Sequence, residues 1–520
     1  MKKTALSLVI LGSLSAAHAA QRPNIVFVFN DDHTRQAIGA YNDRFEMLDP
    51  TPNIDKMAEQ GMRFDRAYVG NSICAPSRAT VLTGKHSHKN GKFNNQKDNV
   101  FDHDQQTFPK LLQQGGYKTA LIGKTHLGHG WGGFDHLDYF PMGGDYYNPI
   151  FTGHNNKRTQ VEGYVTDVIM ERGIDWMESQ RQSGEPFMLA LWNKAPHREF
   201  LPAIRHADKW HDIELPLPAT LYDDYENRPA AAMQTMHIDH NLGFWYDLKV
   251  LEMEDPKDGT QMGGTRWHQR MTDAQRSAWD AKRKPMDDAF LAQKLTGNEL
   301  FEWKYQRYVK DYLRTSYAID ESIGELMEYL EKSGLAENTI IVYSSDQGFF
   351  LGEHGWYDKR FMYEESYSTP LIVRWPAAVK AGSVNADLVQ NIDFAPTFLD
   401  LAGVDIPEDV QGKSLVPLFK GETPEDWRKS LYYHYVDEAH DVRPHEGVST
   451  DQFKLIRFYG KDFEDGEFWE FYDNQRDPEE INNAIDNPEY KLEIKRLKKE
   501  LAKLRKKYEV PDGWPALESQ

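Results

Sequence analysis

Residues 24–32 read Asn-Ile-Val-Phe-Val-Phe-Asn-Asp-Asp, a continuous apolar run that ends in two carboxylates. Three runs of similar character follow, at residues 118–123, 187–192 and 339–345. Uninterrupted apolar runs of this length are typical of strands that are buried on both faces of a mainly parallel sheet. The four runs therefore predict the centre of such a sheet.

Helical patterns alternate with these strands, at residues 53–60, 107–114, 164–180 and 302–330. Strands that alternate with helices indicate an α/β fold in which helices sandwich the central sheet. The segment at about 205–289 is rich in Trp, His, Asp and Met and has no clear strand pattern. We interpret it as a partly helical insertion.

The pattern changes toward the C-terminus. Short strand patterns at 431–436, 453–458 and 469–472 precede a charged helix at about 489–508. These features predict a small α+β subdomain with an antiparallel sheet. The expected domains are accordingly a large α/β domain over residues 20–424, which includes the insertion, and a C-terminal subdomain over residues 425–520.

The N-terminus has the features of a secretory signal peptide, predicted over residues 1–19. Two lysines precede an apolar run at about 5–17, and Ala-His-Ala at 17–19 fits a cleavage site. The apolar run is shorter than the roughly 20 residues that span a bilayer, and no comparable run follows it. We expect a protein without membrane insertion, in the periplasm or secreted.

Composition limits the partners of the chain. A single cysteine cannot form a disulfide within the chain. The formal net charge of −20 argues against nucleic acid and anionic membrane surfaces as partners. An anionic substrate would have to be attracted by a local cluster of basic side chains and metal, because the overall field repels it. The sequence does not indicate an oligomeric state.

Polar side chains follow each of the four central strands. In chain order these are Asp31 and Asp32, Lys124 and His126, Lys194 and His197, and Asp346 and Gln347. Ligands of open α/β sheets bind beyond the carboxyl ends of the strands, so these side chains are expected to converge on one site.

Three carboxylates and one amide in this set indicate a metal site. Asp31, Asp32, Asp346 and Gln347 offer hard oxygen ligands that suit Ca²⁺ or Mg²⁺, without the thiolates and paired imidazoles that zinc favours. Adjacent Asp residues after a strand could equally cap the next helix. The second pair, Asp346 and Gln347, favours the metal.

Cys74 precedes a short helical pattern, and Pro76 fits the first turn of that helix. Cys74 would then lie at a helix N-terminus, where backbone N–H groups favour an anion. A lone cysteine is more often buried and inert, so this position alone leaves both readings open.

The neighbours of Cys74 resemble a known signature. Cys-Ala-Pro-Ser-Arg-Ala-Thr-Val-Leu-Thr-Gly-Lys at 74–85 closely resembles the signature of the type I sulfatases of the alkaline-phosphatase superfamily. The stretch at 116–128 resembles the second signature of that family. Pro-His at 196–197, Ser-Asp-Gln-Gly at 345–348 and Tyr-Asp-Lys-Arg at 357–360 extend the resemblance across most of the catalytic domain.

The resemblance implies an alkaline-phosphatase-like fold and a specific nucleophile. In this family a maturation enzyme oxidises the motif cysteine to formylglycine (3-oxoalanine), whose hydrate attacks sulfur. Cys74 is that residue by resemblance, and the modified side chain also contacts one Ca²⁺ held by Asp31, Asp32, Asp346 and Gln347. Many relatives carry Asn or His at the position of Gln347, but an amide oxygen still serves as a hard ligand.

The resemblance also assigns roles to the basic side chains. Arg78, Lys124 and Lys359 would offset charge on the nucleophile and on the sulfuryl oxygens. His126 would hydrogen-bond the nucleophile, and His197 would protonate the departing oxygen, a role that suits an unperturbed pKa near 6.5.

The stretch at 349–375 resembles carbohydrate sulfatases, including N-acetylglucosamine-6-sulfatases. We therefore expect a sulfuric ester hydrolase that acts on a sulfated saccharide, in the degradation of sulfated polysaccharides. Candidate saccharide contacts are Arg198, His440 and Arg443, together with Trp131, His154 and His445. The segment 440–445 is expected to be a loop of the C-terminal subdomain that reaches over the site.

Two other functions remain open at this point. A formylglycine-dependent phosphonate monoester or phosphodiester hydrolase would share the same site. A sulfated-glycan binding protein would keep the site without maturing Cys74. The sequence does not indicate which sugar or which position carries the sulfate, or whether action is exo or endo.

Overall fold

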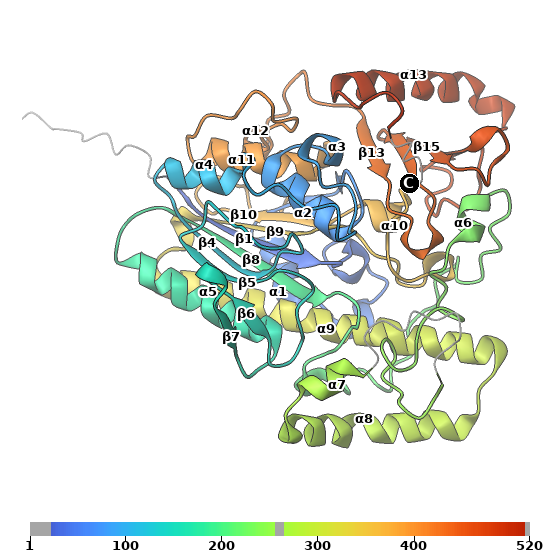
Figure 1. Ribbon diagram of the computed structural model, residues 1–520, viewed down its shortest axis with the longest axis horizontal. Coiled ribbons are helices and arrows are strands. Elements are labelled where there is room, and N and C mark those ends of the chain that lie inside the picture. Colours follow the sequence, from blue (N-terminus) through green and yellow to red (C-terminus); the bar gives the residue numbers. More distant parts are fainter. Residues whose placement is uncertain (1–21, 255–264, 515–520) are drawn as a thin grey trace, which may run out of the picture.

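The computed structural model describes residues 22–254 and 265–514, apart from the side chain of Asp465 (Figure 1). The predicted signal peptide therefore lies outside the described residues. Within the described ranges, no helix combines the length and the apolar character needed to cross a bilayer.

A ten-stranded sheet forms the centre of the molecule, with the strand order β11-β2-β10-β9-β1-β8-β4-β5-β6-β7. Its middle is a parallel group of β9 (Thr339–Ser345), β1 (Asn24–Asp31), β8 (Phe187–Pro196) and β4 (Lys118–Lys124). These are the four strands predicted from the apolar runs, so the expected mainly parallel centre is confirmed.

The edges of this sheet were not predicted. The additional strands are β2 (Met62–Phe64), β5 (His136–Phe140), β6 (Ile150–Thr152), β7 (Arg158–Gln160), β10 (Leu371–Arg374) and β11 (Ser383–Asn385). Of these, β6, β7 and β10 pair antiparallel with their neighbours. All six are only three to five residues long, too short to give a clear periodic pattern.

Helices cover both faces of the sheet, as predicted. On one face, alternate residues of β1 such as Val26 pack with α1 (Pro52–Glu59), α5 (Val165–Arg181) and α9 (Gly297–Ser333). On the other face, residues such as Phe27 pack with α2 (Cys74–Thr83), α4 (Phe108–Gln114) and α11 (Phe394–Leu401). Burial on both faces explains why β1 is apolar without alternation.

Short elements connect and extend these layers. They are α3 (Ser87–Asn90), α10 (Glu364–Tyr367), α12 (Val416–Phe419) and a small parallel pair of β3 (Ala67–Tyr68) and β12 (Val389–Gln390). The described residues of the segment at 205–289 contain α6 (Pro229–Met233), α7 (Arg266–Arg270) and most of α8 (Asp273–Gln293), and no strand.

The C-terminal part is a four-stranded antiparallel sheet of β13 (Leu431–Tyr435), β14 (His445–Ser449), β15 (Phe453–Tyr459) and β16 (Glu467–Asp473). Helix α13 (Lys491–Lys507) packs along one face of it (Figure 1). The predicted antiparallel sheet is confirmed. Strand β14 was missed because it begins His-Glu-Gly, a polar start without the alternation that marks a strand.

Gly123 in β4 provides a test of how closely the central strands approach. Its φ is +120°, and a Cβ at this position would lie 2.8 Å from the carbonyl carbon of Trp192 on β8. Gly184 has a φ of +69°, but a Cβ there would meet open space. We expect Gly123→Ala to lower the free energy of unfolding by well over the roughly 1–2 kcal/mol that positive φ alone costs a side chain.

Gly184→Ala is the matched control for this prediction, since it isolates the cost of positive φ. Urea denaturation of both variants measures the difference. Equal losses in the two variants would contradict a close approach of β4 and β8 at this point.

Candidate active site

The carboxyl ends of the four central strands bring the predicted residues together. Asp31 ends β1, Lys124 ends β4, Asp346 and Gln347 directly follow β9, and His197 directly follows β8. The predicted convergence on one edge of the sheet is therefore present. The loop after β1 is fixed by Tyr312 of α9.

The Tyr312 hydroxyl donates to the Asp32 carbonyl at 2.6 Å and accepts from the Thr34 N–H at 2.8 Å. Both bonds hold the backbone that carries Asp32, a residue with a φ of +71°. The long helix thus positions one of the predicted ligands.

The three aspartates form a compact, fully buried cluster. One carboxylate oxygen from each of Asp31, Asp32 and Asp346 lies within 4.8 Å of the others. The Asp32 N–H also donates to Asp346 Oδ1 at 3.0 Å. Burial and the neighbouring charge of Asp31 raise the pKa of Asp346 well above its usual range. The cluster therefore needs positive charge.

The donor set fits a hard divalent cation. Asp31 Oδ1 and Gln347 Oε1 are both buried without a hydrogen-bond partner. Unsatisfied buried oxygens are costly, whereas carboxylate and amide oxygens are the ligands that Ca²⁺ takes in proteins. Gln347 Nε2 donates to Asp32, which leaves its oxygen free for this role.

Three basic side chains supply charge from other elements. Arg78 of α2 contacts Asp346 Oδ2 through Nε at 3.0 Å and Nη2 at 2.9 Å. Lys359 Nζ lies 2.7 Å from Asp32 Oδ2, and Lys124 pairs with Asp31. Burial disfavours the ionised form of Asp31, but Lys124 and the other nearby basic groups outweigh it and hold the pKa well below its usual range.

Cys74 is the first residue of α2, and Pro76 lies in the first turn as predicted. The Cys74 Sγ lies 4.0 Å from Lys124 Nζ and 3.7 Å from Gln347 Nε2. Arg78 follows four residues later on the same side of the helix. Burial and the charge of Asp31 raise the pKa of the Cys74 thiol well above its usual range. The unmodified thiol is therefore a poor nucleophile at neutral pH.

Both predicted histidines are uncharged in this environment. Burial and the nearby ammonium of Lys124 lower the pKa of His126 and of His197 well below 6.5. His197 Nδ1 bonds the Arg198 carbonyl, and its Nε2 lies 3.9 Å from Asp32 Oδ2. Burial therefore favours the neutral form of His197, whereas the role that the resemblance assigns to it requires the protonated ring.

These residues open into a cavity of about 610 Å³. Cys74, Lys124, His126, His197 and Lys359 all line it. Lys194 lines it as well, as expected from its place after a predicted strand. The sequence assigned no role to several other lining residues, namely Asn95, Asp145, Glu199, Tyr246, Arg266, Asp358 and Arg360.

Some of these could have been found from sequence. Asp358 and Arg360 flank Lys359 within a motif already recognised. Tyr246 and Arg266 come from the segment at 205–289, whose irregular sequence carries no signal of where it folds.

The predicted saccharide contacts divide into two groups. Arg198 and His440 line the cavity. Arg198 Nε also lies 2.6 Å from Asp247 Oδ1, and His440 Nε2 lies 3.4 Å from Asp358 Oδ2. The other four candidates are absent from the cavity lining: Trp131, His154, Arg443 and His445.

Two of those four are held elsewhere. Arg443 pairs with Asp462 at 2.8 Å. His445 is buried in β14 and stacks on Phe361, so the expected loop at 440–445 ends one residue earlier and only its first part reaches the site.

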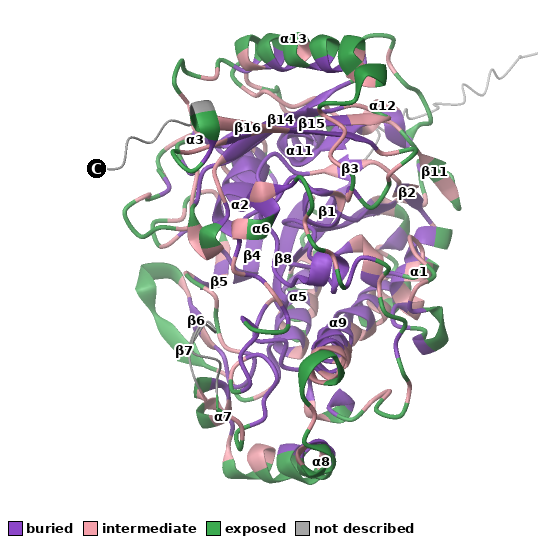
Figure 2. Ribbon diagram, turned by 90° about the vertical axis from the view of Figure 1, so that its right-hand side faces the viewer, coloured by how far each residue is buried: buried purple, intermediate pink, exposed green. Residues whose placement is uncertain are grey.

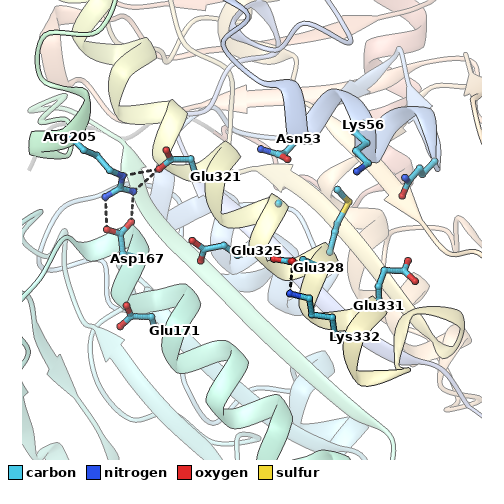
Figure 3. Close-up of a pocket in the computed structure, with 13 residues that line it drawn as sticks. Asn53, Lys56, Asp167, Glu171, Arg205, Glu321, Glu325, Glu328, Glu331 and Lys332 are labelled. Atoms are coloured by element: carbon cyan, nitrogen blue, oxygen red, sulfur yellow. Dashed lines mark hydrogen bonds and ion pairs between the residues drawn. The ribbon is translucent and has the colours of Figure 1, made fainter.

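Cavity size does not identify this site. A larger hollow of about 1110 Å³ lies between α1, α5 and α9 (Figure 3). Its walls are mainly acidic, and Arg205 spans it by pairing with Asp167 and Glu321, each at 2.7 Å. None of the predicted site residues lines it.

Comparison with known proteins agrees with this chemistry. Residues 23–404 match the family described as Sulfatase. The chain belongs to the sulfatase family. Residues 352–507 also match the family described as N-sulphoglucosamine sulphohydrolase, C-terminal. The prediction of a sulfuric ester hydrolase with a sulfatase fold is confirmed.

Among its relatives, this sulfatase is 46% identical to an N-acetylglucosamine-6-O-sulfatase of Bacteroides thetaiotaomicron, over 98% of this chain and 93% of that protein. It is 27% identical to the human N-acetylglucosamine-6-sulfatase, over 83% of this chain and 70% of that protein. One solved structure, 46% identical, superposes with a TM-score of 0.88 over 94% of this chain and 99% of the other, and holds D-glucosamine-2-N,6-O-disulfate as its substrate.

We expect Ca²⁺ to raise the melting temperature of this sulfatase, and Asp346→Asn to abolish that rise. A ligand at 100 times its dissociation constant stabilises the folded state by about 2.7 kcal/mol. Thermal denaturation with and without Ca²⁺, after removal of metal by a chelator, measures the effect without any assay of activity.

Asp239→Asn is the control, because His237, Asp239 and His240 form a separate group with metal-ligand geometry. Its response to Ca²⁺ should equal that of the wild type. A wild type whose melting temperature does not respond to Ca²⁺ would contradict a calcium site in this protein. A loss of response in Asp239→Asn alone would place the cation outside the aspartate cluster.

Proposed function

We propose that this sulfatase hydrolyses the 6-O-sulfate ester of a glucosamine-type sugar in a sulfated saccharide. The position of Cys74 carries the proposal, because it lies at a helix N-terminus, lines the cavity together with Lys124 and Lys359, and lies next to the buried aspartate cluster. The 46% identity with an N-acetylglucosamine-6-O-sulfatase, over 98% of the chain, supports the choice of sugar.

We propose formylglycine at position 74 as the nucleophile, since the protonated thiol is unsuited to attack. Formylglycine supplies a hydrated aldehyde, one hydroxyl of which attacks sulfur while the other lets sulfate leave by elimination. The Cys74 side chain is only 1% exposed in the folded protein. The maturation enzyme is therefore expected to act before the chain folds, ahead of export to the periplasm or the medium.

The basic residues of the chain have distinct tasks in this proposal. Lys124 is 4.0 Å from the Cys74 sulfur and can contact the oxygen that replaces it. Lys359 lines the same cavity, and Arg78 is buried beside Asp346. Both would offset charge on the sulfuryl group. One Ca²⁺ held by Asp31, Asp32, Asp346 and Gln347 would polarise a sulfate oxygen.

His197 is proposed to protonate the departing sugar oxygen. Its Nδ1–H is committed to the Arg198 carbonyl, so the proton for the leaving group must be carried on Nε2. The negative charge of a bound sulfate ester favours the protonated ring. Arg198 and His440, both at the cavity wall, are the remaining candidates for contact with the sugar.

We expect the matured enzyme to release sulfate from N-acetylglucosamine-6-sulfate or N-sulfoglucosamine-6-sulfate, and Cys74→Ala to release none. The assay is a panel of sulfated mono- and oligosaccharides in which the position of the sulfate varies. Mass spectrometry of the peptide that contains residue 74 reports the aldehyde independently.

Phosphonate monoesters and phosphodiesters belong in the same panel. If they were cleaved and no sulfated sugar was, the phosphonate or phosphodiester hydrolase would replace this proposal. If the natural host left Cys74 as a thiol and sulfated sugars still bound, the chain would be a sulfated-glycan binding protein.

We expect His197→Ala to reduce kcat/KM on the sugar sulfate by about 100- to 10,000-fold, as is usual for loss of a general acid. The loss on 4-nitrophenyl sulfate should be much smaller, because nitrophenolate leaves without a proton. His126→Ala is the matched control and should impair both substrates to a similar degree. Equal losses on both substrates for His197→Ala would instead assign that residue to positioning.

A further inference from the structure

The outer side of α13 concentrates positive charge on an acidic protein. The whole chain has a net charge of −20, yet α13 carries nine Lys and Arg and only two Glu. A lysine recurs at every fourth position of the helix. This set, named here the lysine ladder, comprises Lys491, Lys495, Lys499, Lys503 and Lys507.

Packing turns the ladder toward solvent. The opposite side of α13 presents apolar residues to the four-stranded sheet, among them Leu497 and Leu501, which pack with Leu455 of β15 and Phe471 of β16. All five ladder lysines are exposed, and the outer surface of α13 is exposed along the helix (Figure 2). Residues four apart rise by about 6 Å and turn by about 40°, so the ladder is about 24 Å long and winds by about 160° around the outer half of the helix, with its three middle lysines within about 80°.

Few carboxylates neutralise the positive charge of the ladder lysines. Lys503 lies 3.4 Å from Glu500. Lys491, Lys495 and Lys499 form no ion pair with a carboxylate in the described part of the chain. Like charges four residues apart destabilise a helix, so folding of α13 gives no reason for the arrangement.

We propose that the lysine ladder binds a sulfated polysaccharide chain and holds it while the enzyme removes sulfate in the catalytic cavity. This inference rests on the proposed function, because a polymer of the sulfated sugars carries a negative charge at every sulfate. The field of a protein with a charge of −20 repels such a polymer, and a local row of cations offsets that repulsion. Single exposed ion pairs are weak, but a polyanion engages several at once.

The same charges could face an anionic bilayer, but the packing of α13 disfavours it. Helices that bind in a bilayer interface bury their apolar face among the lipids. The apolar face of α13 is already covered by the sheet, and Leu492, 83% exposed, is the large apolar side chain that remains outside. A dissolved anionic polymer, in contrast, does not require an exposed apolar face and can bind through the cations alone.

The test compares two triple variants with equal change in net charge. One is Lys495→Gln, Lys499→Gln and Lys503→Gln within the ladder. The control is Lys157→Gln, Lys380→Gln and Lys420→Gln, three exposed lysines on other parts of the surface. Isothermal titration with heparin at low ionic strength measures binding, and sulfate release is measured on a sulfated polymer and on a monosaccharide sulfate.

We expect the ladder variant to bind heparin at least about tenfold more weakly than the wild type, while the control stays within about threefold. Its binding should also depend less steeply on salt. Its melting temperature should not fall, because like-charge neighbours are removed. Its kcat/KM should drop on the polymer and stay unchanged on the monosaccharide.

Equal losses of heparin binding in the two triple variants, or no loss in either, would overturn the proposal. So would wild-type binding to phosphatidylglycerol vesicles that exceeds binding to heparin and depends on the ladder. Failure of the proposed function is distinguishable, because it removes sulfate release from every variant and both substrates while the difference in heparin binding persists.

Discussion

Charge balance among three buried aspartates is the constraint on which the site depends. Asp31, Asp32 and Asp346 place carboxylate oxygens within 4.8 Å of one another, shielded from water. Such a cluster is stable only when cations or a metal compensate it, because an unpaired buried charge is strongly destabilising. The positions of the basic side chains around the cavity follow from that requirement.

The compensating groups come from distant parts of the chain, so the fold must hold them rigidly. Arg78 arrives on α2, Lys124 at the end of β4, and Lys359 on the loop that follows β9. The C-terminal sheet takes part as well. Tyr433 of β13 donates to the Arg360 carbonyl at 2.5 Å and accepts from the Ser72 N–H at 3.3 Å. One phenol thereby braces the loops that carry Lys359 and Cys74.

A sulfatase acts on an anionic ester, although the formal net charge of this chain is −20. Positive charge is concentrated in two places among the described residues, the catalytic cavity and the outer side of α13. In the cavity, cations such as Lys124 and Lys359 are buried and suited to contact with one anionic group at short range. On α13 they are exposed, screened by salt, and suited to many weak contacts. The acidic groove between α5 and α9 has the opposite character.

The sequence by itself determined the centre of the sheet, the helices on both faces and the chemical composition of the site. Strands buried on both faces must be continuously apolar, and polar residues directly after them must meet at one edge, so local pattern suffices for Asp31, Lys124, His197 and Asp346. The short motif around Cys74 likewise needed no tertiary information.

Only the tertiary structure decided what depends on long-range packing. Strand β14 forms because its neighbours β13 and β15 pair with it, although its own sequence lacks alternation. The irregular segment at 205–289 brings Tyr246 and Arg266 to the cavity through contacts that no local pattern encodes. The lowered pKa of His197 and the exclusion of Arg443 from the cavity follow from burial and pairing, which exist only in the folded chain.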